Sequence, residues 1–332
     1  MSLAVVKVQE VVVEDKYKKK MKLSLWIMGL MFCSMNMFAQ LNDPRERFSL
    51  SATVDGATNT DFTWKSREGE SLAGGRLQPG VNVRVRSNVQ LFANKMLSVS
   101  LAPFYNFSNA ELRTRWGAEN LGFTLPTEHH HYGGTLMLNG NLLAFGKPLT
   151  LLAMGTGNFS QYGYENASGM MGGMIFVTRN QRTVLGLGAI YLLGSAVSWP
   201  LYPLIIYSHK FDDRWSINCM EAYNYLYYQA SPMIKYSVGM ELETDKFYFR
   251  PHQEGLPKKA MYSQVSERVG LFADIQATKE LSLHFGAGGQ VPFYGRLRES
   301  GYNHNYMTLR DEVKPFVNMR VKYSLMRKPQ AK

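Results

Sequence analysis

Several long segments of this chain alternate between apolar and polar residues, and this alternation restricts the possible folds more than any other feature. From Val81 to Leu91 the odd-numbered positions are mostly valine or leucine, whereas the even-numbered ones are Asn, Arg or Gln. Residues 281–291 and 313–323 repeat the pattern. A period of two indicates β-strands with one apolar face.

Strand length separates a soluble sandwich from a membrane barrel. Strands of globular proteins average about five or six residues, whereas tilted membrane strands need about nine to eleven. The alternating runs here reach the longer range. Charged residues make up 19% of the chain, below the roughly 25% of soluble domains. The mean hydropathy of −0.22 excludes a bundle of membrane helices. We therefore expect an all-β protein, a transmembrane antiparallel up-and-down β-barrel.

The connections between the alternating runs predict the number of strands. Short connections are expected near 93–95, 145–148, 179–182, 211–214, 244–246 and 277–280. Longer ones are expected near 59–77, 110–130, 162–168, 194–201, 250–262 and 297–311, with a brief one at 230–232. Together they predict fourteen strands, or twelve if 247–250 does not form a strand of its own.

The N-terminal region has the pattern of an export signal. Met21–Phe32 has a basic start and a short apolar core, and Ala39 precedes Gln40 at a small-residue cleavage site. We expect cleavage after Ala39, with 21–39 as the signal peptide and 40–332 as one barrel domain in the outer membrane of a Gram-negative cell. Residues 1–20 read as an upstream extension, with Met21 as the true start. The alternative is a long basic region that includes 18–20.

An uncharged segment, 183–208, is long enough to cross a membrane as a helix. Pro200 and Pro203 would break such a helix in its interior. We therefore predict two strands, 183–193 and 201–210, and keep the helix as the alternative.

Charged residues on the inward faces are the candidate functional residues. In a closed barrel the last strand pairs with the first, so basic residues near both ends of the chain could share one wall. The candidates that line the interior are Arg84, Arg86, Lys314, Arg320, Lys322, Glu241, Glu243, Asp274 and His284. An unpaired basic wall would attract anions. If the basic residues pair instead with Asp55, Glu241, Glu243 or Asp274, they only fill a polar interior.

Other side chains suggest weaker alternatives. Leu152 and Met154 make part of the interior apolar, which suits a hydrophobic ligand or a lumen filled by side chains. The tyrosines at 223, 225, 227 and 228 fit an aromatic girdle. Adjacent histidines at 129–131 alternate faces and cannot all point at one catalytic centre. As a metal site they lack acidic or cysteine partners nearby, so we expect a solvated loop edge there.

Catalysis is disfavoured because no histidine has an assigned serine partner, and His209 and His284 lie beside short turns. We therefore expect no cofactor and no catalytic residue. The net charge of +11 is not gathered into a basic run after the signal, which excludes nucleic acid as a partner.

The export signal ending in Met37-Phe38-Ala39-Gln40, the alternating strands and the closing Val321-Lys322-Tyr323 resemble an outer-membrane β-barrel of the Bacteroidota type. The similarity is to uncharacterised families of that phylum and covers 40–332 as a pattern. It implies assembly by the outer-membrane insertion machinery and supplies no catalytic residue. Asn318 stands where that machinery usually reads glycine, and 324–332 extend beyond the closing aromatic residue.

These observations predict a passive channel or solute-binding barrel with a partly basic interior. Its partners would be the lipid bilayer, the insertion machinery and a small anionic or apolar solute. The alternatives are a structural or adhesion barrel with a filled lumen, and an outer-leaflet lipid-modifying enzyme.

Overall fold

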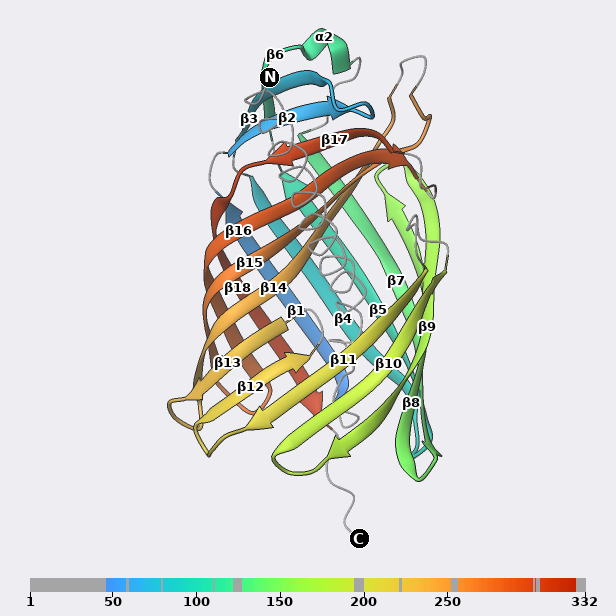
Figure 1. The fold of residues 1–332 in the computed structure, drawn as a ribbon, viewed down its shortest axis with the longest axis vertical. Coiled ribbons are helices and arrows are strands. Elements are labelled where there is room, and N and C mark those ends of the chain that lie inside the picture. Colours follow the sequence, from blue (N-terminus) through green and yellow to red (C-terminus); the bar gives the residue numbers. More distant parts are fainter. Residues whose placement is uncertain are drawn as a thin grey trace, which may run out of the picture.

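The computed structural model describes residues 46–326, except 58–59, 79, 110, 122–126, 194–199, 221–222, 252–255, 301 and 303–304. The expected extension, signal peptide and cleavage site all lie outside these residues. The described part is almost entirely β-structure (Figure 1). Among the described residues, no helix is long and apolar enough to span a membrane.

Fourteen strands form one closed antiparallel barrel, because β1 pairs with both β4 and β18. Each strand pairs with the next around the ring. The barrel strands are β1 (Glu46–Ala57), β4 (Val81–Ala93), β5 (Leu97–Asn109), β7 (Glu128–Ala144), β8 (Lys147–Ser160), β9 (Gly163–Arg179), β10 (Thr183–Leu193), β11 (Leu201–Lys210), β12 (Trp215–Met220), β13 (Tyr223–Gln229), β14 (Ile234–Phe249), β15 (Ala260–Gln276), β16 (Leu281–Glu299) and β18 (Lys314–Met326). The predicted all-β barrel is confirmed.

The number fourteen is correct, but several of the predicted strand boundaries are wrong. Residues 163–168 were expected in a longer connection, yet they belong to β9 and pair with β8. Residues 244–246 form no turn, because β14 runs on without interruption and pairs with β15 up to Phe249. The count stays at fourteen because Trp215–Met220 and Tyr223–Gln229 form two separate antiparallel strands, β12 and β13. The connection at 230–233 therefore lies at the same end as the short turns. The uncharged segment forms β10 and β11, as predicted.

A small sheet covers the end of the barrel opposite the short turns, and we call it the cap (Figure 1). It consists of β2 (Thr60–Ser66), β3 (Ser71–Gln78), β6 (Glu111–Trp116) and β17 (Asn305–Asp311), and it joins the barrel through β16. A four-residue helix, α2 (Ala118–Leu121), follows β6. These segments were expected to be irregular loops. They form strands because they bury an apolar core around Trp64, Phe249 and Leu297.

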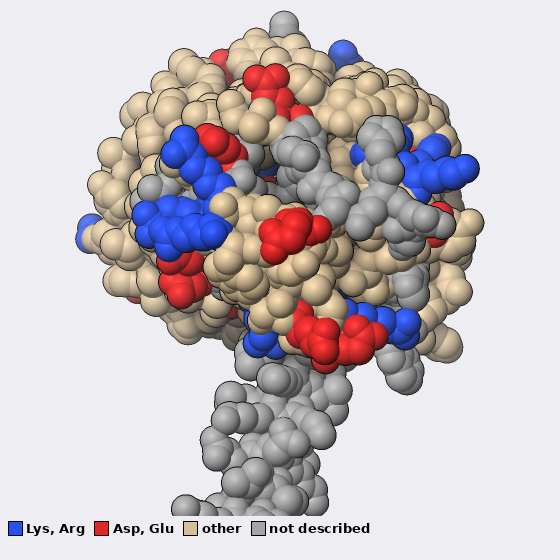
Figure 2. All heavy atoms as spheres, turned by 90° about the horizontal axis from the view of Figure 1, so that it is seen from above, with Lys and Arg blue, Asp and Glu red and all other residues tan. Residues whose placement is uncertain are grey.

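The outward and inward faces of the barrel differ in chemistry. Large apolar side chains such as Leu136, Leu271 and Val317 are exposed on the outside. Acidic and basic side chains lie next to one another at the capped end rather than in patches of one sign (Figure 2). Arg76 and Asp61 are one such pair, with Nε and Oδ1 3.1 Å apart.

Three glycines lie side by side in β14, β15 and β16. Gly239, Gly270 and Gly288 are direct neighbours in the strand register. A Cβ atom on any of them would lie within 2.0–2.2 Å of a backbone carbonyl oxygen of an adjacent strand. The backbones therefore approach more closely there than a side chain permits.

We expect Gly270→Ala to destabilise the barrel by about 1–3 kcal/mol, because the added methyl group forces the strands apart. Gly155→Ala is the matched control, since nothing lies within 4 Å of a Cβ atom at that position. Urea unfolding followed by tryptophan fluorescence measures both. Equal effects of the two changes would contradict a close approach at Gly270.

Candidate functional site

The candidate residues come together because the strand register places the first barrel strand, β1, beside the last, β18. Thr53 of β1 pairs with Arg84 on one side and with Arg320 on the other. Ser51 likewise lies between Arg86 and Lys322. At these two levels, basic side chains thus flank the short hydroxyl side chains of Ser51 and Thr53. The shared wall expected from the sequence is present.

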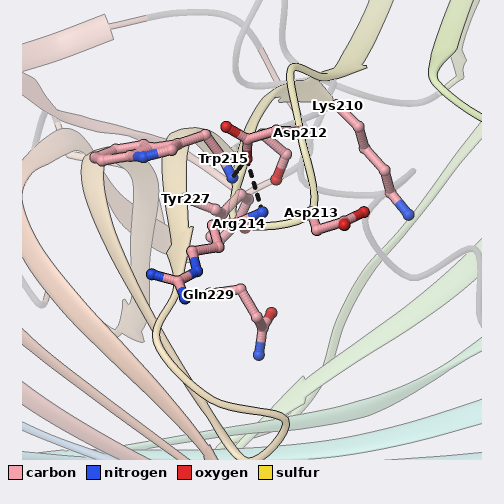
Figure 3. Close-up of a pocket in the computed structure, with 8 residues that line it drawn as sticks. Lys210, Asp212, Asp213, Arg214, Trp215, Tyr227 and Gln229 are labelled. Atoms are coloured by element: carbon pink, nitrogen blue, oxygen red, sulfur yellow. Dashed lines mark hydrogen bonds between the residues drawn. The ribbon is translucent and has the colours of Figure 1, made fainter.

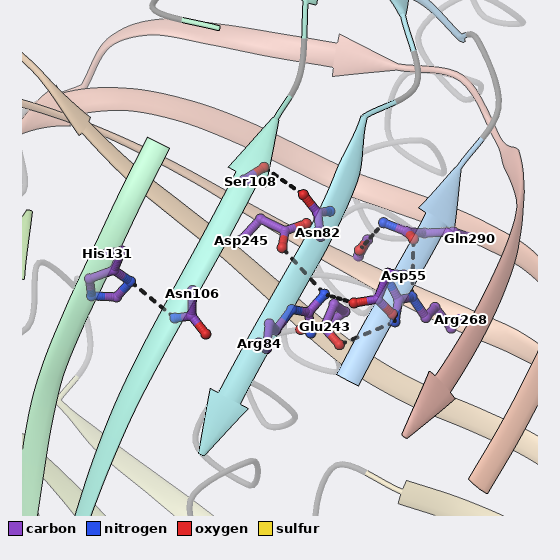
Figure 4. A network of polar contacts seen from close by, with 11 residues as sticks. Asp55, Asn82, Arg84, Asn106, Ser108, His131, Glu243, Asp245, Arg268 and Gln290 are labelled. Atoms are coloured by element: carbon purple, nitrogen blue, oxygen red, sulfur yellow. Dashed lines mark hydrogen bonds and ion pairs between the residues drawn. The ribbon is translucent and has the colours of Figure 1, made fainter. Parts of the chain in front are cut away.

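Arg84 is held in an ionic network inside the barrel, which we call the charged network (Figure 4). Its Nη2 lies 2.7 Å from Oδ2 of Asp55, and its Nη1 contacts Glu243. Arg268 of β15 also reaches Asp55, with Nη1 2.7 Å from Oδ1, and lies 3.4 Å from Glu243. Asp245 lies 3.7 Å from Arg84. Five charges from β1, β4, β14 and β15 therefore meet in a small buried volume.

The charged network is supported by polar neighbours. Arg268 donates from Nε to Oε1 of Gln290 at 3.1 Å, and Gln290 donates to Ser266 at 2.8 Å. Such support allows buried charges to persist, because unpaired buried charges are strongly disfavoured. For Arg84 the structure therefore favours the ion-pairing interpretation over an open anion-attracting lining.

A second polar group lies nearer the short turns. His284 of β16 is 2.7 Å from Asp274 through Nδ1 and 3.4 Å from Glu241 through Nε2. Tyr225 donates a hydrogen bond to Glu241. Lys235 lies 3.6 Å from the far oxygen of Asp274. Glu241 and Asp274 are thus engaged with a histidine, a tyrosine and a lysine rather than with Arg86 or Arg320.

The remaining basic candidates differ in their burial and in whether they form ion pairs. Lys322 pairs with Glu46 at 3.2 Å near the short-turn end. Lys314 is buried beside Gln290. Arg86 is exposed to solvent on the inward face, and Arg320 is half-buried. Within the described ranges neither Arg86 nor Arg320 forms an ion pair, although Glu243 is among the charges that act on both.

Arg268 and Gln290 were not identified as candidates from the sequence. A signal for Arg268 was present, since it lies six positions before the inward Asp274 on one strand and an even offset places both side chains on the same face. Its contact with Asp55, far away in the sequence, depends on closure of the barrel. Which distant side chains meet inside a closed barrel cannot be read from a local pattern.

The tyrosine girdle is wrong for three of its four members. Tyr225 is buried inside the barrel and bonded to Glu241, and Tyr223 stacks on it with ring centroids 5.9 Å apart. Tyr227 also lies against Tyr225 on the inward side. Only Tyr228 packs on the outward-facing Trp215. The three inward tyrosines form an aromatic lining on β13.

The three adjacent histidines alternate in direction as predicted, but the expected solvated loop edge is wrong. His129 and His131 are buried on β7, and His129 stacks on Phe247 of β14 with ring centroids 4.3 Å apart. His130 points the other way and bonds to Tyr105. No group of three His, Cys, Asp or Glu among the described residues could hold a metal ion. Among the same described residues, no histidine is hydrogen-bonded to a serine hydroxyl.

A shallow depression lies at the turn between β11 and β12 (Figure 3). Asp212 accepts hydrogen bonds from the backbone N–H groups of Trp215 and Arg214 at 2.6 and 2.7 Å. These bonds hold the pKa of the Asp212 carboxyl below its usual range. The depression is formed by a well-capped turn, and nothing in its lining indicates catalysis.

No family model matches this sequence. A search of curated proteins also finds no match. Among solved structures, the barrel is similar to a FadL homologue from Pseudomonas aeruginosa, with 11% identity, 86% of this chain and 93% of that chain covered, and a TM-score of 0.41. It is also similar to an outer-membrane channel from Pseudomonas putida F1, with 11% identity, 84% of this chain and 96% of that chain covered, and a TM-score of 0.42. For the outer-membrane protease OmpT from Escherichia coli the identity is 9%, 83% of this chain and 97% of that chain are covered, and the TM-score is 0.30. At these values no function is carried from those proteins to this one.

Proposed function

We propose that the protein is an outer-membrane barrel that passes or binds small solutes through an interior narrowed by the charged network. The observation that carries this proposal is the contrast between the two faces: exposed leucines and valines outside, charged and polar side chains inside. A barrel of that kind is stable only with its outer belt in lipid. The expected signal peptide supports export, and the resemblance to Bacteroidota barrels agrees with this location.

The interior between the charged network and the short turns favours small anions as solutes. Arg86 and Arg320 lie there on the inward face without an ion-pair partner among the described residues. Arg84, by contrast, is already neutralised by carboxylates. The two free guanidinium groups can therefore attract an anion from solution, whereas Arg84 acts mainly as a structural residue.

We expect the double variant Arg86→Gln, Arg320→Gln to keep its conductance in planar bilayers while losing preference for anions over cations. The loss should be clear in about 0.1 M salt, where the Debye length is about 10 Å, and small in about 1 M salt, where it is about 3 Å. Reversal potentials in a salt gradient measure the preference. Lys322→Gln is the control, because Lys322 is already paired with Glu46. Unchanged selectivity in the double variant would contradict the basic lining.

A structural barrel with a filled interior is the second candidate, and the charged network itself favours it. The network joins β1, β4, β14 and β15 across the interior, and the cap lies above it. If the unmodified protein forms no conducting channel in planar bilayers, the structural function is favoured instead.

A further inference from the structure

Arg86 and Arg320 lie on the two strands that flank β1, and β1 carries only short side chains between them. Ser51 pairs with Arg86, and Thr53 pairs with Arg320. The two arginines are thus two strands and two residues apart, which places their Cα atoms about 12 Å from each other. Their long side chains can lean over the hydroxyls of β1 and reach one anion from both sides.

Tyr223 of β13 faces the same part of the interior. Both arginines are among the charged groups that act electrostatically on Tyr223, and Arg320 also acts on Arg86. The ring of Tyr223 lies nearly parallel to the ring of Tyr225, with an interplanar angle of 11°. Tyr223 is only half-buried, so both its ring and its hydroxyl are available to a ligand.

Asn318 of β18 adds an amide group without a partner. It lies two positions before Arg320 and therefore on the same inward face. Asn318 is 6% exposed, and among the described residues neither its Oδ1 nor its Nδ2 forms a hydrogen bond. Gly286 of β16 makes room for this amide, because a Cβ atom there would collide with Oδ1. An unpaired buried amide is unfavourable, so a ligand that pairs with both of its atoms gains stability.

The charges in this part of the interior leave a small positive excess. The charged network holds three carboxylates and two arginines, and the group around His284 holds two carboxylates and Lys235. Lys314, Arg86 and Arg320 add three positive charges. With a neutral His284, these groups together carry one positive charge more than they carry negative charges. A ligand with a single negative charge balances this excess.

The chemistry of these side chains favours a carboxylate that also carries hydroxyl groups. Guanidinium groups bind carboxylates through paired hydrogen bonds. An ionised carboxylate only accepts hydrogen bonds, so it cannot satisfy Oδ1 of Asn318, whereas a hydroxyl group both donates and accepts. The ring of Tyr223 offers an apolar face with a polar hydroxyl at its edge, which suits a ring that bears hydroxyl groups.

We propose that the inner wall binds a sugar acid, a small hydroxylated ring with one carboxylate, at a site formed by Arg86, Arg320, Asn318 and Tyr223. The carboxylate lies between the two guanidinium groups above β1, and the ring hydroxyls reach the amide of Asn318. This inference rests on the proposed function, because it names the class of solute that the interior takes.

Three ligands of similar size separate the effect of the charge from that of the hydroxyl groups. Glucuronate carries both, glucose carries only hydroxyl groups, and cyclohexanecarboxylate carries only the charge. Their dissociation constants for the protein in detergent micelles are measured by saturation-transfer NMR titration. We expect glucuronate to bind at least tenfold more tightly than either of the others. If cyclohexanecarboxylate binds as tightly as glucuronate, only charge is recognised, and the site is overturned.

Arg320→Gln tests the carboxylate contact. It should weaken the binding of glucuronate at least tenfold and leave the binding of glucose within twofold, because glucose has no carboxylate. Lys322→Gln is the matched control, since Lys322 lies on the same face of the same strand but is paired with Glu46. It should leave the affinity for glucuronate within twofold. Equal losses in the two variants would overturn the assignment of Arg320.

Asn318→Leu tests the hydroxyl contact, because it replaces the amide with an apolar side chain of similar size. It should weaken the binding of glucuronate at least fivefold and leave that of cyclohexanecarboxylate within twofold. Asn139→Leu is the control: Oδ1 of Asn139 also lacks a partner among the described residues, but Asn139 lies on β7 near a short turn. Equal effects of the two changes would overturn the hydroxyl contact. Heat-dependent gel mobility verifies that the variants fold, and the three-ligand comparison needs no variant.

Failure of the site and failure of the proposed function give different results. A barrel that conducts with a preference for anions, yet binds glucuronate no more tightly than cyclohexanecarboxylate, overturns the sugar-acid site and leaves the proposed function in place. A barrel that neither conducts nor binds any of the three ligands overturns both. Tight binding of glucuronate without conductance supports the site and contradicts only the passage of solutes.

Discussion

Replacing Arg84 with glutamine should lower the free energy of unfolding by about 3–5 kcal/mol, because it leaves buried carboxylates without their counter-ion. Arg84 contacts Asp55, Glu243 and Asp245, and the side chain of Asp55 is only 3% exposed. Arg268 alone would then face three carboxylates. Glutamine retains a donor and most of the length, so the effect reports the missing charge. Urea titration of the barrel in detergent micelles, followed by heat-dependent gel mobility, measures the loss.

Arg113→Gln is the control for this change. Arg113 also pairs with a carboxylate, Glu111, at 3.1 Å, but its side chain is 61% exposed. Its loss should therefore cost about 0–1 kcal/mol. A double variant, Arg84→Gln with Glu243→Gln, should recover part of the stability by removing one of the stranded charges. If Arg84→Gln costs no more than Arg113→Gln, the network is hydrated rather than buried.

The sequence predicted the features that depend on local alternation. The boundaries of β10 and β11 agree with the predicted strands, and the basic residues of β4 and β18 lie on either side of β1 as expected. Both results follow from period-two alternation and from the closure of a barrel. Neither requires knowledge of which distant side chains meet.

Features that depend on bending and on distant contacts were not predicted. Thr244-Asp245-Lys246 has the composition of a turn, yet it stays extended because each of its residues pairs with β15. Asp245 also lies within 3.7 Å of Arg84, a residue on β4. Long-range pairing here outweighs local turn preference, as strand propensities depend strongly on context.

The cap and the inward tyrosines show the same dependence on tertiary structure. The segments that form β2, β3 and β17 have polar, turn-rich flanks, which predict loops. They form strands because residues such as Trp64 and Leu297, distant in the sequence, pack into one core. The sequence of β13 suggests that Tyr225 belongs to a girdle, whereas in the structure its hydroxyl donates a hydrogen bond to Glu241 of β14 inside the barrel. In both cases the partner, rather than the segment itself, determines the structure.

An arginine in place of Leu136 should destabilise the barrel by about 2–4 kcal/mol if that face lies near the middle of the bilayer. Leu136 occupies the middle of β7, is 46% exposed and pairs with Leu101, which is also exposed. Because water is absent from the bilayer core, the guanidinium group would have to be dehydrated or drawn to the interface.

Leu142→Arg is the matched control, since Leu142 lies on the same face of the same strand but close to the short turn. Near the interface the cost falls to about 0–1 kcal/mol. Folding titrations into liposomes of defined thickness measure both variants. Equal costs at the two positions would show that the outward belt faces water, and the barrel would then not be embedded in a membrane.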